Sequence, residues 1–224
     1  GKTTLIKAIL GFLSPKAGRG QVMGADMITE GPVIRQRVGL MPEQDCHIPG
    51  LSAVGFIAYA GELAGMPADQ ALRRSHEVLE YVGLGEARYR MVETYSTGMK
   101  QRIKFAQALI HGPKLLLLDE PTNGLDPRGR EEMLDLIRSV SQTKGVSVIV
   151  SSHLLPDIER TCDRVVVIAK GQLRAEGTIA ELTRIAGAPL HVELKEPSSK
   201  LIIALQEQGI EFQFAQGNSM QIRG

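Results

Sequence analysis

The first four residues, Gly1-Lys2-Thr3-Thr4, match the last four positions of the pattern G-x-x-x-x-G-K-[ST]. That pattern builds a loop whose backbone N–H groups surround phosphates. Apolar residues then recur at helical spacing from Thr3 to Leu13, and a helix starting here would point its N-terminus at the anion. We therefore expect a fragment that begins inside a nucleotide site, without the front half of the loop and its leading strand.

Composition sets limits on what this chain does. Its 224 residues suffice for one large α/β domain with a small appendage. The net charge of +1 comes from 26 basic and 25 acidic residues, which argues against a nucleic-acid partner. Cys46 and Cys162 predict no disulfide framework and favour a reducing, cytosolic setting. No apolar run approaches the ~20 residues of a membrane span, so any membrane role would need a partner.

Strands are predicted to alternate with helices, which is typical of a mostly parallel sheet. Residues 114–119 form a continuous apolar strand, a pattern typical of burial on both faces, and 146–151 is expected to be a second buried strand. An alanine- and leucine-rich stretch, about 51–112, predicts a helical subdomain inserted into a phosphate-loop core. We place one α/β domain at 1–186 and a truncated α+β extension at 187–224. The predicted strands are 21–23, 37–41, 114–119, 146–151, 164–169, 172–176, 190–194 and 210–214, and the predicted helices are 3–13, 53–64, 69–82, 99–110, 128–143, 154–162 and 200–208.

Two carboxylates end the most apolar predicted strand, in the run Leu115–Glu120. Acids at the C-terminal end of a buried strand occupy the usual ligand position of an open α/β sheet. Asp119 is suited to Mg²⁺, which prefers carboxylate oxygen and keeps several waters. Glu120 is placed to polarise or deprotonate water. The competing interpretation is a strand that simply ends on two solvated acids.

Two further positions have both a functional and an ordinary interpretation. Ser96 and Gly98 precede the helix predicted at 99–110, where a hydroxyl, a glycine and free N–H groups form an anion site. An ordinary N-cap explains Ser96 equally well. His153 follows the strand 146–151 and is suited to donate to a phosphate oxygen, whereas a lone loop histidine is more often structural.

Six motifs follow one another in one order. They are Gly1–Thr4, a Pro-Glu-Gln loop at 42–44, Tyr95–Arg102, Leu115–Pro121, Gly124–Pro127 and Ser151–His153. This order resembles the nucleotide-binding domain of ATP-binding cassette (ABC) transporters, from Gly1 to about Thr183. The element Tyr95–Arg102 is the most specific, because other phosphate-loop ATPases lack it.

The resemblance implies an ATPase that uses ATP and Mg²⁺. Gly1 and Lys2 would hold the nucleotide, with Lys2 neutralising the β- and γ-phosphates. Thr4 would donate to the α-phosphate. Thr3 and Asp119 would hold the metal ion.

The resemblance also implies a division of labour between two subunits. Glu120 would be the catalytic base and His153 would sense the γ-phosphate. Ser96 and Gly98 would close over ATP held by a second copy, and Asp126 would lie at that interface. Two copies would form a head-to-tail homodimer, and a lone fragment would be inactive.

The sequence departs from the family pattern in three places. The front of the phosphate loop and the aromatic residue that stacks on adenine are absent, so we expect poor ATP binding by this fragment. Residues Ser96–Met99 read Ser-Thr-Gly-Met, where Ser-Gly-Gly-Gln is commoner. The glutamine expected after the strand 37–41 aligns with Glu43, and Gln44 comes one place late, so either could serve its Mg²⁺ and water contact.

These variants resemble the subgroup that serves drug, antibiotic and polysaccharide exporters. The resemblance implies an ATPase subunit at the cytoplasmic face of the membrane, held there by a multi-span permease. A soluble ABC ATPase acting on ribosomes or nucleic acid is the alternative, although only about 90 residues separate Lys2 from Ser96 and contain no long coiled coil. A non-catalytic regulatory cassette is a third possibility, which Lys2, Asp119, Glu120 and His153 argue against.

Overall fold

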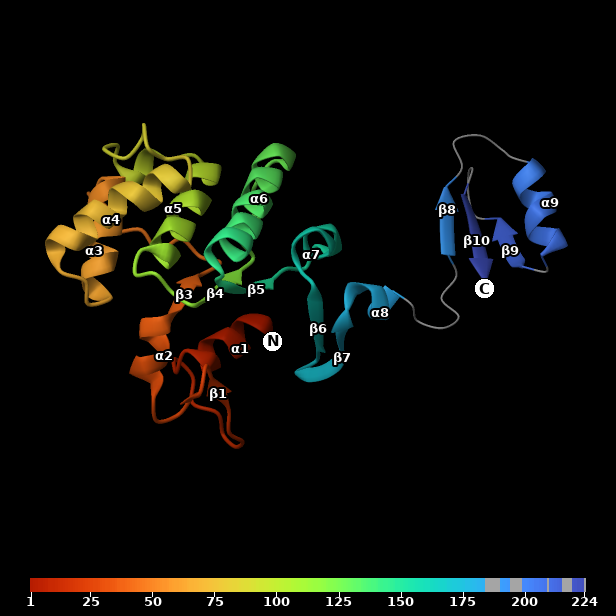
Figure 1. Ribbon diagram of the computed structural model, residues 1–224, viewed down its shortest axis with the longest axis horizontal. Helices are drawn as coiled ribbons and strands as arrows, with labels where there is room; N and C mark the ends of the chain where they lie inside the picture. Colours follow the sequence, from red (N-terminus) through yellow and green to blue (C-terminus); the bar gives the residue numbers. More distant parts are fainter. Residues whose placement is uncertain (184–189, 194–198, 209, 215–218, 224) are drawn as a thin grey trace. The chain divides into compact units, whose positions relative to one another are not determined.

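Three parallel strands form the central sheet of the computed structural model, in the order β3 (Val38–Met41), β4 (Leu115–Asp119) and β5 (Ser147–Ser151) (Figure 1). Helices lie between them in the sequence, as parallel connections require. The structure thus confirms the predicted α/β class with a parallel sheet.

The structure describes residues 1–183, 190–193, 199–208, 210–214 and 219–223. They fall into two compact units, 1–163 with 168–174, and 164–167 with 175–224. The predicted domain boundary at 186–187 lies outside the described residues and stays a prediction. The remaining strands are β1 (Gln21–Val22), β2 (Ala25–Asp26), β6 (Arg164–Ala169), β7 (Gln172–Thr178), β8 (Leu190–Glu193), β9 (Glu211–Phe214) and β10 (Ser219–Arg223). The helices are α1 (Lys2–Ile9), α2 (Gly31–Arg37), α3 (Ala53–Leu63), α4 (Ala68–Tyr81), the 3₁₀ turn η1 (Val92–Thr94), α5 (Thr97–Leu109), α6 (Pro127–Lys144), α7 (Leu155–Thr161), α8 (Ile179–Thr183) and α9 (Ser199–Glu207).

Side-chain caps fix where the main helices begin. Ser52, Ser96 and Asp126 each accept a hydrogen bond from a backbone N–H in the first turn of α3, α5 and α6. Gly145 ends α6 in the left-handed conformation, at φ 62°. These ends lie within two residues of the predicted ones, because capping is encoded locally.

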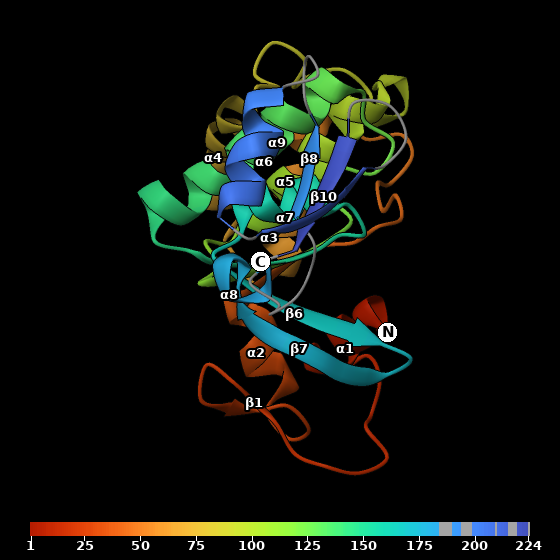
Figure 2. The ribbon, with the colours of Figure 1, turned by 90° about the vertical axis from the view of Figure 1, so that its right-hand side faces the viewer.

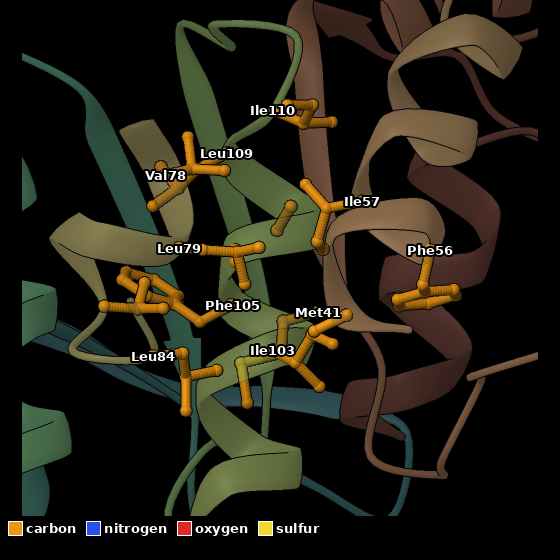
Figure 3. Close-up of a cluster of buried hydrophobic side chains, with 14 of the residues drawn as sticks. Met41, Phe56, Ile57, Val78, Leu79, Leu84, Ile103, Phe105, Leu109 and Ile110 are labelled. Atoms are coloured by element: carbon orange, nitrogen blue, oxygen red, sulfur yellow. The ribbon is translucent and has the colours of Figure 1, made fainter. Parts of the chain in front are cut away.

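Strand β4 is buried on both faces because successive side chains point to opposite sides of a sheet. Leu116 and Leu118 pack in a cluster with α3, α4 and α5, and part of that cluster is drawn in Figure 3. Leu115 and Leu117 pack in a second cluster with α1 and α2. Each buried leucine stabilises the fold by roughly 1.5–3 kcal/mol, so this strand anchors the elements that carry the site.

The prediction that β5 is a buried strand is wrong. Ile149 is 49% exposed and Ser147 is exposed as well. The reason is that β5 is the edge of the three-stranded sheet in the part of the chain that the structure describes. Helix α2 was not predicted; it has proline in its first turn, where proline is well tolerated.

Strands β6 and β7 lie side by side as the predicted hairpin, and its tip is Lys170-Gly171 (Figure 2). Both tip residues have positive φ, at 51° and 75°, as a tight primed turn requires.

In the second unit β10 pairs antiparallel with both β8 and β9, and β10 was not predicted. Within the described ranges, no helix combines the length and apolar character that crossing a bilayer demands.

Candidate active site

The C-terminal ends of the parallel strands bring the predicted acids together. The register of β4 and β5 places Asp119 opposite Ser151. The Ser151 hydroxyl donates a hydrogen bond to Asp119 Oδ1. Both side chains belong to residues that are less than a tenth exposed, so this contact fixes one carboxylate oxygen and leaves the other oxygen to accept a further ligand.

Glu120 is the centre of the candidate site. Lys2 Nζ donates to its Oε1 at 2.6 Å, and His153 Nδ1 lies 2.8 Å from its Oε2. The lysine opens α1 and the histidine follows β5, so three distant segments converge on one carboxylate. The structure therefore brings together three of the predicted site residues, Lys2, Glu120 and His153.

The backbone at Glu120 is unusual. Its φ is +50°, a left-handed conformation that non-glycine residues seldom adopt. The Glu120 N–H donates to Ser151 O at 2.9 Å, which holds this turn against β5. Such a conformation costs on the order of 1–3 kcal/mol and persists where surrounding contacts enforce it, often at functional sites.

Opposing influences set the pKa of Glu120. Burial acts to raise it, but the hydrogen bonds from Lys2 and His153 and their positive charges outweigh burial. The pKa of Glu120 therefore lies below the usual glutamate value of 4.5, and its side chain is a carboxylate at neutral pH. A carboxylate with both oxygens oriented is suited to accept a proton or to polarise water.

The start of α1 is suited to bind an anion. Gly1 provides no side-chain cap, and the first amides of a helix have no acceptor within it. Together with the helix dipole and the Lys2 ammonium they favour negative charge. Thr3 is half-buried and Thr4 is exposed in this same turn.

Ser96, Gly98 and Asp126 form a second group, where α5 and α6 begin. Met99 N donates to Ser96 Oγ at 3.3 Å, and Gly129 N donates to Asp126 Oδ1 at 2.9 Å. Both side chains therefore act as helix caps. None of the hydrogen bonds or ion pairs of the described residues joins this group to Lys2, Glu120 or His153.

Glu43 and Gln44 follow β3 in an exposed loop. No hydrogen bond or ion pair in the described ranges connects either side chain with Glu120, so the choice between them stays open. Sequence reasoning missed Lys104, whose Nζ donates to the carbonyls of Pro42 and Glu43 in this loop. Nothing in the sequence signals this lysine, which lies among apolar residues of a helix.

The candidate donors are a hydroxyl and a carboxylate. This small oxygen set fits Mg²⁺ better than it fits a metal ion that is coordinated entirely by side chains. The described residues contain no cluster of three or more histidines, cysteines or acids that could hold a metal. Thr3 and Asp119 supply one hydroxyl and one carboxylate. Mg²⁺ commonly binds through one or two such groups together with phosphates and waters.

Comparison with known proteins agrees with this geometry. The family model described as ABC transporter matches residues 1–123. An uncharacterized ABC transporter ATP-binding protein, YxlF of Bacillus subtilis (strain 168), is 39% identical over 81% of this chain. The linearmycin resistance ATP-binding protein LnrL of the same bacterium is 36% identical over 87% of it. The chain spans 59% and 62% of the lengths of these two relatives.

A solved structure supports the same assignment. The structure of cbiO1 from Clostridium perfringens, described as part of the ABC transporter complex cbiONQ, is 26% identical and superposes with a TM-score of 0.73. The match covers 83% of this chain and 75% of that one. Since the family model spans more than half of the residues, the chain belongs to the ABC transporter family of ATP-binding proteins.

Proposed function

We propose that this chain is the ATP-hydrolysing part of an ABC exporter subunit. The observation that supports this most strongly is the convergence of Lys2 and His153 on Glu120 at the end of β4. Glu120 would be the base that polarises the attacking water. His153, which is exposed, would contact the γ-phosphate.

ATP would bind at the start of α1. Lys2 would leave Glu120 to neutralise the β- and γ-phosphates, while Gly1, Thr3 and Thr4 would contribute their amides. The Thr4 hydroxyl would donate to the α-phosphate. Thr3 and Asp119 would hold Mg²⁺, and Glu43 or Gln44 would approach it. When bound, Mg²⁺ would neutralise the charge that develops on the phosphates.

A second copy would complete each site. Ser96, Gly98 and Asp126 make no contact with the Lys2–Glu120–His153 cluster among the described residues, yet the resemblance assigns them to the same reaction. At Gly98 an added Cβ would lie 3.8 Å from its nearest neighbour, Leu125, so packing within the chain does not require glycine. A head-to-tail homodimer, in which a partner's ATP approaches Gly98, accounts for both facts.

The transport role rests on the relatives. LnrL is described as a resistance protein, and cbiO1 as part of a transporter complex. We infer export of a drug-like or antibiotic substrate through a separate multi-span permease, with this subunit at the cytoplasmic face. The permease would dock in the groove between the core and the helical subdomain at about 51–112. Residues 1–186 would form the ATPase domain, and 187–224 would be accessory.

Purification of the full-length protein tests this assignment. Glu120→Gln should trap ATP-bound dimers, and these should co-purify from detergent extracts with a polytopic membrane protein in the presence of ATP and Mg²⁺. Glu159→Gln, which alters an exposed acid of α7, is the matched control and should not trap dimers. Co-purification with ribosomes or nucleic acid, without a membrane chain, would instead favour the soluble alternative.

A further inference from the structure

Helix α5 packs against β3 at a distance that allows no side chain between them. A Cβ added at Gly39 would lie 2.1 Å from the Ala108 carbonyl oxygen, far inside van der Waals contact. Met41 and Ile103 continue this interface in the buried cluster (Figure 3). The strand and the helix therefore form one rigid unit that extends to the end of β3.

Lys104 lies one helical turn before Ala108 and is only 3% exposed, between the buried Ile103 and Phe105. Side chains on a helix lean toward its N-terminus, which here carries the ammonium past the end of β3. Lys104 Nζ donates to Glu43 O at 2.9 Å and to Pro42 O at 3.1 Å. Asp45 Oδ1 lies 3.7 Å away.

An ammonium has three donors and no acceptor. The carbonyls of Pro42 and Glu43 accept two of these hydrogen bonds, and the Asp45 carboxylate lies at ion-pair distance only. Burial, partly offset by Asp45, lowers the pKa of Lys104. If the loop moved off α5, this buried charge would lose its partners, which is strongly unfavourable. Lys104 therefore holds the loop to the helix by donating to the backbone carbonyls of Pro42 and Glu43.

The same helix also holds the loop that follows Glu120. Gln101 lies three residues before Lys104, so the two side chains share a face. Gln101 is 6% exposed, and its Nε2 donates to Asn123 O at 2.8 Å. Two buried polar side chains thus fasten the loops after β3 and β4 to the helix that begins at Ser96.

We propose that Lys104 is a positioning residue that makes the loop at 42–45 move as one body with α5. This proposal rests on the proposed function, because it deepens the role given to Glu43 and Gln44. A change in that loop when ATP binds would pass through Lys104 to Ser96 and Gly98, which would face ATP on a second copy. No sequence motif assigns this role to Lys104.

The test compares Lys104→Met with two controls in the full-length protein. Lys100→Met removes a lysine of the same helix that lies 3.9 Å from the same Asp45 but donates to neither carbonyl. Asp45→Asn removes the nearby charge and leaves both carbonyl contacts. A second variant, Lys104→Gln, covers the case in which methionine disturbs folding.

Hydrogen exchange without nucleotide is the first readout. Lys104→Met should speed amide hydrogen exchange at residues 43–48 by about tenfold or more, because the loop then opens locally more often. The exchange rates of β4 should stay unchanged. The exchange rates of both control variants at these residues should stay within about threefold of the wild-type rates. Unchanged exchange at 43–48, or an equal increase across β4, would overturn the proposal.

ATP turnover per folded molecule is the second readout. Lys104→Met should lower kcat by about tenfold and change ATP affinity by less than about threefold. A kcat equal to that of Lys100→Met would contradict the positioning role. The exchange readout needs no ATP, so it can fail or succeed independently of the proposed ATPase activity, which Glu120→Gln tests separately.

Discussion

Lys2 Nζ donates to Glu120 Oε1 at 2.6 Å, joining the first residue of α1 to the residue that follows β4. The contact stabilises the charged form of a carboxylate that is only 11% exposed in its side chain. It also places a cation at the start of a helix, where a phosphate would compete with the carboxylate for it.

Lys2→Met should therefore lower the free energy of unfolding in a pH-dependent manner. The pKa of Glu120 is depressed in the folded state, so its contribution is present above the usual value of 4.5 and is lost as pH falls through the lowered pKa. We expect a loss of about 1 kcal/mol at pH 7, shrinking toward zero in strong acid. Urea unfolding at several pH values measures it, with the exposed Lys7→Met as control; a pH-independent loss would contradict the assignment.

Ser151→Ala should destabilise the fold by removing the hydroxyl that donates to the buried Asp119. Leaving a buried acceptor without its donor costs about 1–3 kcal/mol. Ser147→Ala, on the exposed part of the same strand, should cost less than about 0.5 kcal/mol. Chemical denaturation of both variants checks this, and equal losses would show that the Ser151 contact is not special.

Gly39→Ala should be among the most disruptive small substitutions in the chain. The new methyl group would overlap the Ala108 carbonyl oxygen at 2.1 Å, and neither the strand nor the helix backbone can yield without moving core side chains. We expect a loss of about 3 kcal/mol or more. A thermal midpoint within two or three degrees of the wild type, measured by circular dichroism, would refute the close packing of α5 on β3.

Gly98→Ala should separate stability from function. The added methyl group would have room, and alanine in a helix is worth up to about 1 kcal/mol more than glycine. Under the proposed function, however, Gly98 must let a partner's ATP approach, so turnover should fall by roughly tenfold. A stable variant with wild-type turnover would remove Gly98 from the site.

The sequence predicted those parts of the fold that depend on local chemistry. The run Leu115–Leu118 specified a strand buried on both faces, and Ser96 was weighed as the N-cap that it proves to be at the start of α5. The cap that Asp126 provides for α6 was not predicted. The exposure of β5 could not be predicted, because an edge strand and a central strand can have the same apolar composition. Whether a strand has a neighbour depends on topology.

The contacts of the site were less predictable than its members. Glu120 and His153 were candidates because of their places at strand ends, and the family resemblance assigned their roles. Their pairing with Lys2 spans 118 positions and depends on how α1 packs on β4. Lys104 was missed because lysine in a helix ordinarily faces solvent. Its burial follows from the approach of α5 to β3 at Gly39, which no local pattern encodes.

The most direct measurement is ATP turnover by the full-length protein carrying Glu120→Gln, beside Glu159→Gln and the wild type. Loss of a positioned general base should lower kcat by roughly 10²–10⁴-fold while ATP binding persists, and Glu159→Gln should match the wild type. If Glu120→Gln hydrolyses ATP at the wild-type rate, Glu120 is not the base and the proposed site is wrong.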